Sequence, residues 1–150
     1  MQLEKYEYRA HENFINYNFE SVGPRGIIRK AVEYQPMDWE VNGKIVMNLF
    51  FGDWNEREQR IDDSTVTDNN DRDKVLATVA STILEFIQER GRYPIHAKGA
   101  SPVKTRLYQM GINANRAEIE SLFLIFGYYK EEWIPFESGK NFDAFLVIKR

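Results

Sequence analysis

Charged and polar side chains that could bind an anion gather in two stretches of this 150-residue chain. An acidic stretch with two neighbouring asparagines follows an apolar run, and a basic stretch comes later. Lysine and arginine side chains beside a helix N-terminus can hold a carboxylate or a phosphate. The candidate ligand-binding residues are Asp53, Asp63, Asn70, Asp73, Lys98, Ser101, Lys104 and Arg106.

The same charges also have a purely structural interpretation. Arg106 paired with Asp53 or Asp63 would pin the acidic stretch to a sheet, and such ion-pair networks perturb side chains much as active sites do. Tyr108 is the candidate for a catalytic side chain, as a general acid, but a tyrosine next to an inward residue such as Leu107 is more often a packed or half-exposed aromatic. The residues alone leave both interpretations open.

A long helix must position the acidic part of this set. Apolar residues recur with helical spacing from Val75 to Ile87, which predicts a helix that packs across a sheet. Asn70 is the predicted N-cap, and Asp73 lies in the first turn, where a negative charge suits the helix dipole. Gly91 is the predicted C-terminal stop.

A second helix is predicted to position the basic part. Ser101 and Pro102 indicate its start, because serine caps helices and proline is favoured at the first helical position. Gly111 is its predicted end. The apolar residues at helical spacing, which we expect to face the core, are Val103, Leu107 and Met110.

A third helix is predicted from Asn115, with Glu118 as its capping partner, to a stop at Gly127. Alternating or apolar runs predict four strands at residues 17–22, 27–35, 44–51 and 94–99, and a closing hairpin of residues 129–136 and 141–149. The glycine-rich GPRG at residues 23–26 predicts a turn between the first two strands. Pro36 is expected to end the second strand and Asp53 to follow the end of the third. Residues 54–73 are then a long polar connection.

These elements follow the order β-β-β-α-β-α-α-β-β. That order predicts a single α+β domain over residues 1–150, with a mixed, mostly antiparallel sheet and one βαβ crossover. If the two central strands are parallel, Asp53 and Lys98 meet at their C-terminal edge, where the helices begin at Asn70 and Ser101. Open sheets bind ligands in the crevice beyond such strand ends, so we expect all eight candidates there.

This order is similar to that of the GNAT acyltransferase fold, and LYQMGI at residues 107–112 resembles the LYxxxGF segment of that superfamily. The resemblance implies an N-acyltransferase with Tyr108 as general acid. However, GNAT enzymes hold the coenzyme A pyrophosphate on a glycine-rich loop before the long helix. Here that connection has no glycine after Gly52 and is rich in aspartate, so coenzyme A is not expected as a cofactor.

A more specific resemblance is to a family of small uncharacterised proteins from Bacteroidetes. It is carried by FGD at residues 51–53, IDD at 61–63, NNDRDKVLATVA at 69–80, GASPVKTRLY at 99–108 and NFDAFLV at 141–147. The resemblance implies no activity.

Composition excludes several classes of function. Cysteine is absent, which removes disulfides, thiolate nucleophiles and zinc–sulfur sites. His11 and His96 have no partners at ligand spacing, so no metal is expected. No apolar leader or span is evident, and we expect a cytoplasmic protein. A net charge of −3 and a pI near 5.5 make nucleic acid an unlikely partner.

The sequence therefore predicts a non-catalytic binding or interaction protein without a cofactor. Its partner would be a small anionic ligand or another protein, and a homodimer stays open. The alternative is a GNAT-like N-acyltransferase with an atypical cofactor loop.

Overall fold

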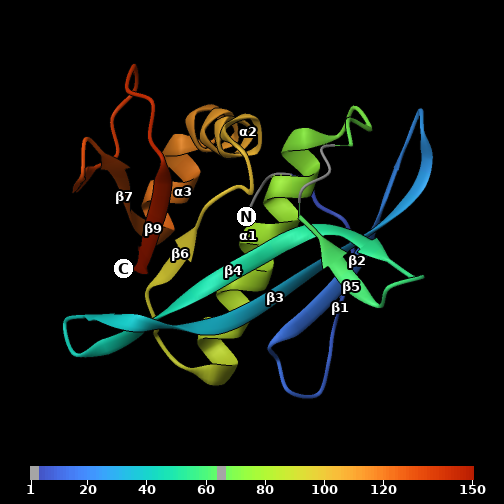
Figure 1. The fold of residues 1–150 in the computed structure, drawn as a ribbon, viewed down its shortest axis with the longest axis horizontal. Coiled ribbons are helices and arrows are strands. Elements are labelled where there is room, and N and C mark those ends of the chain that lie inside the picture. The colour runs from blue at the N-terminus through green and yellow to red at the C-terminus, as the bar shows by residue number, and fades with distance from the viewer. Residues whose placement is uncertain (1–3, 64–66) are drawn as a thin grey trace. The chain divides into compact units, whose positions relative to one another are not determined.

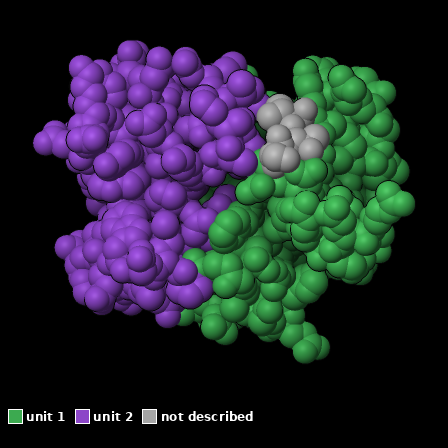
Figure 2. Space-filling view, in the orientation of Figure 1, with its two compact units in different colours: residues 1–35, 50–91 green, residues 36–49, 92–150 purple. Residues whose placement is uncertain are grey.

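The chain folds into helices and a mixed, mostly antiparallel sheet, as predicted for the α+β class. The structure, a computed structural model, describes residues 4–63 and 67–150. Its contacts divide the chain into two compact units (Figure 2). Unit 1 contains Met1–Gln35 and Phe50–Gly91, and unit 2 contains Pro36–Leu49 and Arg92–Arg150.

The strands of unit 1 form two antiparallel ladders. β1 (Tyr8–Ala10) pairs with β2 (Asn16–Gly23), and β2 pairs with the first part of β3 (Gly26–Val41). The β2–β3 turn follows the predicted glycine-rich signal, and Gly26 has a φ of +89°, which suits glycine. The last part of β4 (Lys44–Asn55) pairs with β5 (Arg60–Asp62).

The helix of unit 1, α1 (Arg72–Arg90), packs its apolar face on these strands. The ring of Tyr34 stacks on Phe86 with centroids 4.3 Å apart, and its hydroxyl lies 2.9 Å from Thr82 Oγ1. The helix was correctly predicted in place and length. Its N-cap, however, is Asp71 rather than Asn70, and the Asp71 side chain makes no capping hydrogen bond.

Unit 2 contains the first part of β4 and all later elements (Figure 1). These are β6 (Ile95–Ala97), α2 (Pro102–Ala114), α3 (Arg116–Leu122), β7 (Phe123–Tyr129), β8 (Glu132–Pro135) and β9 (Ala144–Lys149). The strand order in this unit is β4-β6-β9-β7-β8. β4 and β6 are parallel, with Met47 opposite Ile95, which confirms the predicted crossover connection.

The structure has strands that the predicted order lacks, namely β1, β5 and β7. β3 does not end at Pro36 but continues to Val41, and β4 does not end before Asp53 but continues to Asn55. Asp53 therefore lies inside a strand, opposite Asp62 of β5. The connection after β4 is correspondingly shorter than predicted.

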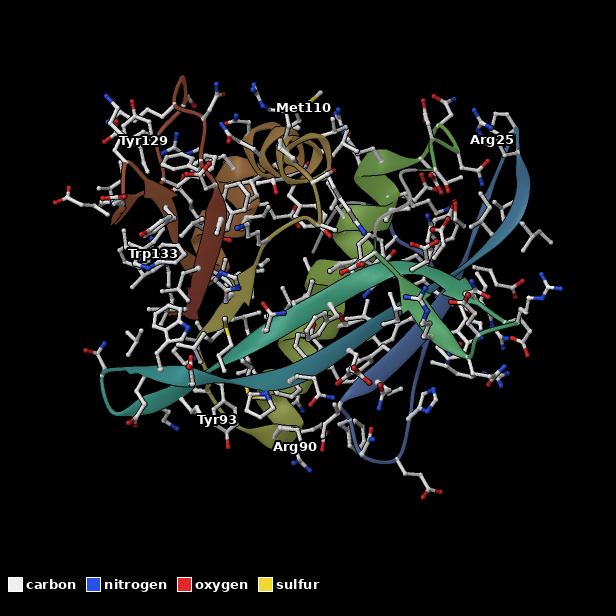
Figure 3. All side chains as sticks on the ribbon, in the orientation of Figure 1. Arg25, Arg90, Tyr93, Met110, Tyr129 and Trp133 are labelled. Atoms are coloured by element: carbon white, nitrogen blue, oxygen red, sulfur yellow. The ribbon has the colours of Figure 1, made fainter. Side chains whose placement is uncertain are left out.

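The inward face of α2 differs from the prediction. Val103 is 63% exposed and Met110 is 43% exposed, and Met110 lies on the outer side of the helix (Figure 3). The buried residues of α2 are instead polar ones, Lys104, Thr105 and Gln109, with Gly111 inside the helix rather than at its end. Gln109 explains this orientation, because its amide donates to Lys140 O and accepts from Phe142 N at 3.0 Å.

The third helix ends earlier than predicted. α3 stops at Leu122, and the apolar run that follows is β7 rather than more helix. Gly127 is a strand residue, and a Cβ there would lie 2.2 Å from Phe142 Cδ1. Because β8 and β9 both pair with β7 and not with each other, the predicted closing hairpin is also wrong. Asn115 precedes α3 but donates its amide to Gly111 O instead of capping that helix.

None of the helices within residues 4–63 and 67–150 is long and apolar enough to cross a membrane.

Candidate functional site

The eight predicted ligand-binding residues are divided between the two units. Unit 1 contains four of them, which are Asp53, Asp63, Asn70 and Asp73. Unit 2 contains the other four, which are Lys98, Ser101, Lys104 and Arg106. Their convergence in one crevice stays a prediction, and each half is described here within its own unit.

Asp53 takes part in a network inside unit 1. Its carboxylate pairs with Lys30 Nζ and accepts a hydrogen bond of 2.5 Å from Thr67 Oγ1. Lys30 lies opposite Phe19 in the β2–β3 ladder, on the strand face that carries the core rings, and its Nζ lies 6.0 Å from the centroid of the Phe51 ring. Both oxygens of Asp53 are thus held by protein groups, as a structural role requires.

The residues just before α1 hold the β2–β3 hairpin. Asn69, 2% exposed, donates its amide to Ser21 Oγ at 3.0 Å and to Gly26 O at 3.1 Å, and accepts from Arg25 N at 2.8 Å. Asp71 accepts hydrogen bonds from Ser21 Oγ at 2.5 Å and from Tyr6 OH at 2.6 Å. Asn69 and Asp71 therefore form a structural clamp on the β2–β3 hairpin.

The other predicted residues of unit 1 are nearer the surface. Asn70 is exposed with a φ of +59°, and its backbone N donates to Asp68 Oδ1. Asp73 pairs with Arg72 at 3.2 Å, where both side chains are largely solvated. Asp63 is half-buried. Lys74 in the first turns of α1 pairs with Glu4 at 3.5 Å, and its Nζ lies 4.2 Å from the centroid of the Tyr6 ring.

In unit 2, Ser101 caps α2 as predicted, since its Oγ accepts from Lys104 N at 3.2 Å. Thr105 Oγ1 accepts from Gly99 N at 3.0 Å, which ties the helix to the loop after β6. Lys98 and Arg106 are exposed, whereas the Lys104 side chain is buried. Tyr108 is half-buried.

Sequence reasoning missed a cluster of aromatic rings in unit 2. This aromatic cluster consists of Trp39, His96, Tyr128 and Trp133, all half-buried. Trp39 and Trp133 stack with centroids 6.0 Å apart and planes at 22°, and Tyr128 lies 5.1 Å from Trp133. His96 meets both indoles edge-on, at 6.3 and 6.1 Å.

The strand register places these rings on one face of the sheet of unit 2. His96 of β6 is opposite Leu146 of β9, and Tyr128 of β7 is opposite both Ala144 of β9 and Trp133 of β8. The alternate residue Phe145 points to the other face, where it contacts Phe136. Arg116 of α3 stacks on Phe136, so the helices of this unit cover the face opposite the aromatic cluster. Trp133 lies on the β8 side of unit 2 (Figure 3), and the strand residues Val46, Ala144 and Leu146 on the face of the aromatic cluster are buried.

The surroundings of His96 determine which ring nitrogen carries its proton and favour the neutral ring. Asn48, its neighbour in the parallel pair, accepts a hydrogen bond from His96 Nδ1 through Oδ1 at 2.7 Å. Burial and the nearby charge of Lys98 lower the pKa of His96 below 6.5. The imidazole is therefore neutral at pH 7, and its Nε2 carries a lone pair that can accept a hydrogen bond.

Nε2 of His96 is not fully buried. Every buried side-chain nitrogen and oxygen in the described part of the chain has a hydrogen-bond partner. Within that same part, the hydrogen bond made by the His96 ring is the one from Nδ1. Nε2 therefore keeps some exposure, and the aromatic cluster contains one hydrogen-bond acceptor beside its stacked indoles.

Carboxylates are absent from the strand positions on this face. The register gives its members as Lys44, Val46, Asn48, His96, Leu124, Phe126, Tyr128, Trp133, Pro135, Ala144, Leu146 and Ile148. The acidic residues Asp38 and Glu40 alternate with Trp39, and Glu132 precedes Trp133, so their side chains leave on the other side of their strands. The face is aromatic and apolar, with lysine as its charge.

A signal for this face was present in the sequence. Single tryptophans that alternate with acidic residues, as in DWE at residues 38–40, are typical of a strand with one aromatic face. The pairing of Trp39 with Trp133 across unit 2 could not be read from such local patterns, because it depends on the order of strands in the sheet.

Comparison with known proteins gives one result. A family model described as "Family of unknown function (DUF6934)" matches residues 2–150. Searches of curated proteins and of solved structures found no match. The match agrees with the uncharacterised family expected from the sequence motifs.

Proposed function

We propose a role for this chain, which belongs to DUF6934, a family of unknown function, from the geometry of its site. The chain is a non-catalytic binding domain. It recognises an anionic ligand, or the anionic part of a partner, at the aromatic cluster and Lys98. Lys98 follows the C-terminal end of β6, so the proposal keeps the strand-end location expected from the sequence. Lys104 and Arg106 belong to α2, on the opposite side of the sheet of unit 2, so their predicted ligand-binding role is not part of this proposal.

The observation that carries this proposal is the half-buried aromatic cluster of unit 2 with the exposed Lys98 near His96. Aromatic rings and asparagine are common in recognition surfaces because they supply contact area and hydrogen bonds at low entropy cost. A face with lysine and without strand carboxylates attracts an anion and disfavours a cation. Lys98 is close enough to His96 to lower its pKa, so its charge acts within the aromatic cluster.

The acidic side chains of unit 1 favour a binding role over acyltransfer, because protein groups already occupy them. Asp53 is occupied by Lys30 and Thr67, and Asp71 is occupied by Ser21 and Tyr6. A general base needs a free lone pair directed at a substrate. At the start of α1, Asp71 and Asp73 would also repel the pyrophosphate that an acyltransferase cofactor brings.

Inorganic polyphosphate is a suitable probe, because it is an anion without rings. The three tryptophans give separate indole signals in an NMR spectrum, and Trp54 of unit 1 is an internal reference. Saturable binding should shift the Trp39 and Trp133 signals and leave Trp54 in place. Lys98→Glu should weaken binding at least tenfold, whereas Arg57→Glu, the same charge change at an exposed position of unit 1, should not.

Equal weakening by both variants would mean diffuse attraction, and absence of binding would contradict the proposal. A parallel assay with acetyl-CoA tests the enzymatic alternative. Acetyl-CoA turnover that drops on Tyr108→Phe would replace the binding role with an acyltransferase.

A further inference from the structure

We propose that residues 36–41 of β3 bind an extended segment of a partner protein that carries lysine or arginine, and that this segment adds to the sheet of unit 2 as a further strand. The inference goes beyond the proposed function, because it concerns the backbone of a sheet edge rather than the aromatic cluster. Two features carry it, which are backbone groups without a strand partner and two carboxylates beside them.

The outer edge of β3 has no neighbouring strand over residues 36–41. In the described part of the chain, β3 pairs with β2 and β4 and with no other strand. The ladder with β2 ends at Glu33 of β3, and one further hydrogen bond runs from Tyr34 N to Ile15 O at 2.9 Å. Beyond that bond β3 continues to its end as an edge strand, and the backbone of an edge strand can pair with another chain.

The alternation along β3 determines which backbone groups point outward. Asn42 and Gly43 have φ values of +53° and +79°, as in the two-residue turn that joins paired strands (Figure 1). The residues that flank such a turn bond to each other, so the last residue of β3 directs its N–H and C=O toward β4. Asp38 and Glu40 lie an odd number of residues before it and direct theirs away from β4. Tyr34 has the same parity and bonds on the β2 side.

The side chains of Asp38 and Glu40 give this edge its selectivity. Both residues are exposed, and neither carboxylate has an ion-pair or hydrogen-bond partner within residues 4–63 and 67–150. Alternate residues of a strand share a face, so the two carboxylates lie on one face about 7 Å apart along the strand. Two cations at alternate positions of an added strand would lie opposite them, and such cross-strand pairs are stabilising. Trp39 points to the other face, where an apolar residue of the added strand would meet it.

A second copy of this chain is a poor occupant of the edge. Antiparallel pairing of two copies through residues 36–41 would place Asp38 and Glu40 against the same carboxylates, and like charges on opposite strands are destabilising. Pro36 also has no N–H to donate at its outward position. Proline and charge on an edge prevent such self-association, whereas the same two charges attract a strand of the opposite sign. The occupant is therefore a segment that alternates basic and apolar residues.

A heptapeptide of alternating lysine and valine, blocked at both ends, is the probe for the full chain labelled with nitrogen-15. Binding should slow hydrogen exchange at the amides of Asp38 and Glu40 at least tenfold, because the added strand accepts hydrogen bonds from them. The amides of Met37 and Trp39 point toward β4, so their exchange should change by less than about twofold. Slow exchange of Asp38 and Glu40 without peptide would show that the edge is already paired, and would overturn the proposal.

Two control peptides separate strand addition from simple charge attraction. One has four lysines followed by three valines, and the other alternates glutamate with valine. Both should bind at least tenfold more weakly than the probe, and the affinity of the probe should fall as salt rises. Equal affinity for the block of lysines would mean diffuse attraction, and equal affinity for the glutamate peptide would mean that charge does not select the strand. Either result overturns the proposal, as does absence of binding by the probe.

Substitutions on the edge test the two carboxylates themselves. Asp38→Lys and Glu40→Lys should each weaken binding of the probe about fivefold or more. Asp143→Lys makes the same charge change at an exposed position elsewhere in unit 2, and it should leave the affinity within about twofold. Equal weakening by all three variants would overturn the assignment to this edge. Thermal melting checks that the variants are folded, and if one is not, the exchange rates of the unsubstituted chain decide.

Discussion

Lys30 of β3 and Asp53 of β4 form an ion pair in the interior of unit 1, with side chains 8% and 18% exposed. Removing one member of a buried pair leaves the other charge without compensation. We expect Lys30→Met to lower the free energy of unfolding by about 3–5 kcal/mol. Urea denaturation followed by circular dichroism measures this change.

The double variant Lys30→Met, Asp53→Leu removes both charges and provides the control. It should be more stable than Lys30→Met alone, since no unpaired charge is left in an apolar site. Additive losses from the two substitutions would show that the pair is solvated and that Asp53 is free for another role.

The neighbouring asparagines before α1 should respond differently to substitution. Asn69→Ala leaves the backbone N–H of Arg25 and the carbonyl of Gly26 without their partner, which should cost about 3 kcal/mol of unfolding free energy. Asn70 is exposed with a positive φ, so Asn70→Gly should change stability by less than about 0.5 kcal/mol. Thermal melting of the two variants side by side tests this contrast, and similar losses would contradict the clamp.

The orientation of α2 gives a prediction opposite to that from its apolar pattern. Val103→Lys should leave stability within about 0.5 kcal/mol, because the side chain faces solvent. Gln109→Leu should cost about 2 kcal/mol or more, because Lys140 O and Phe142 N lose their hydrogen bonds. Denaturant titration of both variants decides the matter. A large loss for Val103→Lys would mean that the apolar face is the buried one.

His96 makes the stability of the protein depend on pH. Its pKa is lowered in the folded state by burial and by Lys98, so folding favours the neutral ring. As the pH falls below 6.5, the unfolded chain takes up the proton first, and stability should decrease until the folded pKa is reached. Denaturation curves at pH 7.5 and 5.5 should show this loss, and His96→Gln should reduce it. An unchanged pH dependence in that variant would remove His96 as its source.

The sequence was informative where local rules decide the structure. The cap at Ser101, the long apolar stripe of α1 and the turn after β2 follow from the properties of a few neighbouring residues, and each was predicted in the right place. The parallel pairing of β4 with β6 also followed, because a helix between two strands favours it.

The errors have a common physical cause, which is that distant groups override local preference. Gln109 turns α2 over because its amide satisfies backbone groups some thirty residues away. Asp53 stays within β4 because Lys30 neutralises it. The run after Leu122 fits a helix or a strand equally well by its apolar pattern, and its pairing with β9 decides for a strand. The aromatic cluster was missed for the same reason, since Trp39 and Trp133 meet only in the assembled sheet.

β3 and β4 pass through both units, and each unit is built from two separate pieces of chain. During synthesis, the hairpin that joins these strands emerges before the whole of residues 50–91, while β6, which pairs with it, emerges after them. All of unit 1 has therefore been made once Gly91 is reached, whereas unit 2 then consists only of residues 36–49 and lacks the partner of its first strand. No single cut in the chain would release one unit intact. Recombination at one junction therefore cannot exchange a whole unit between two related chains.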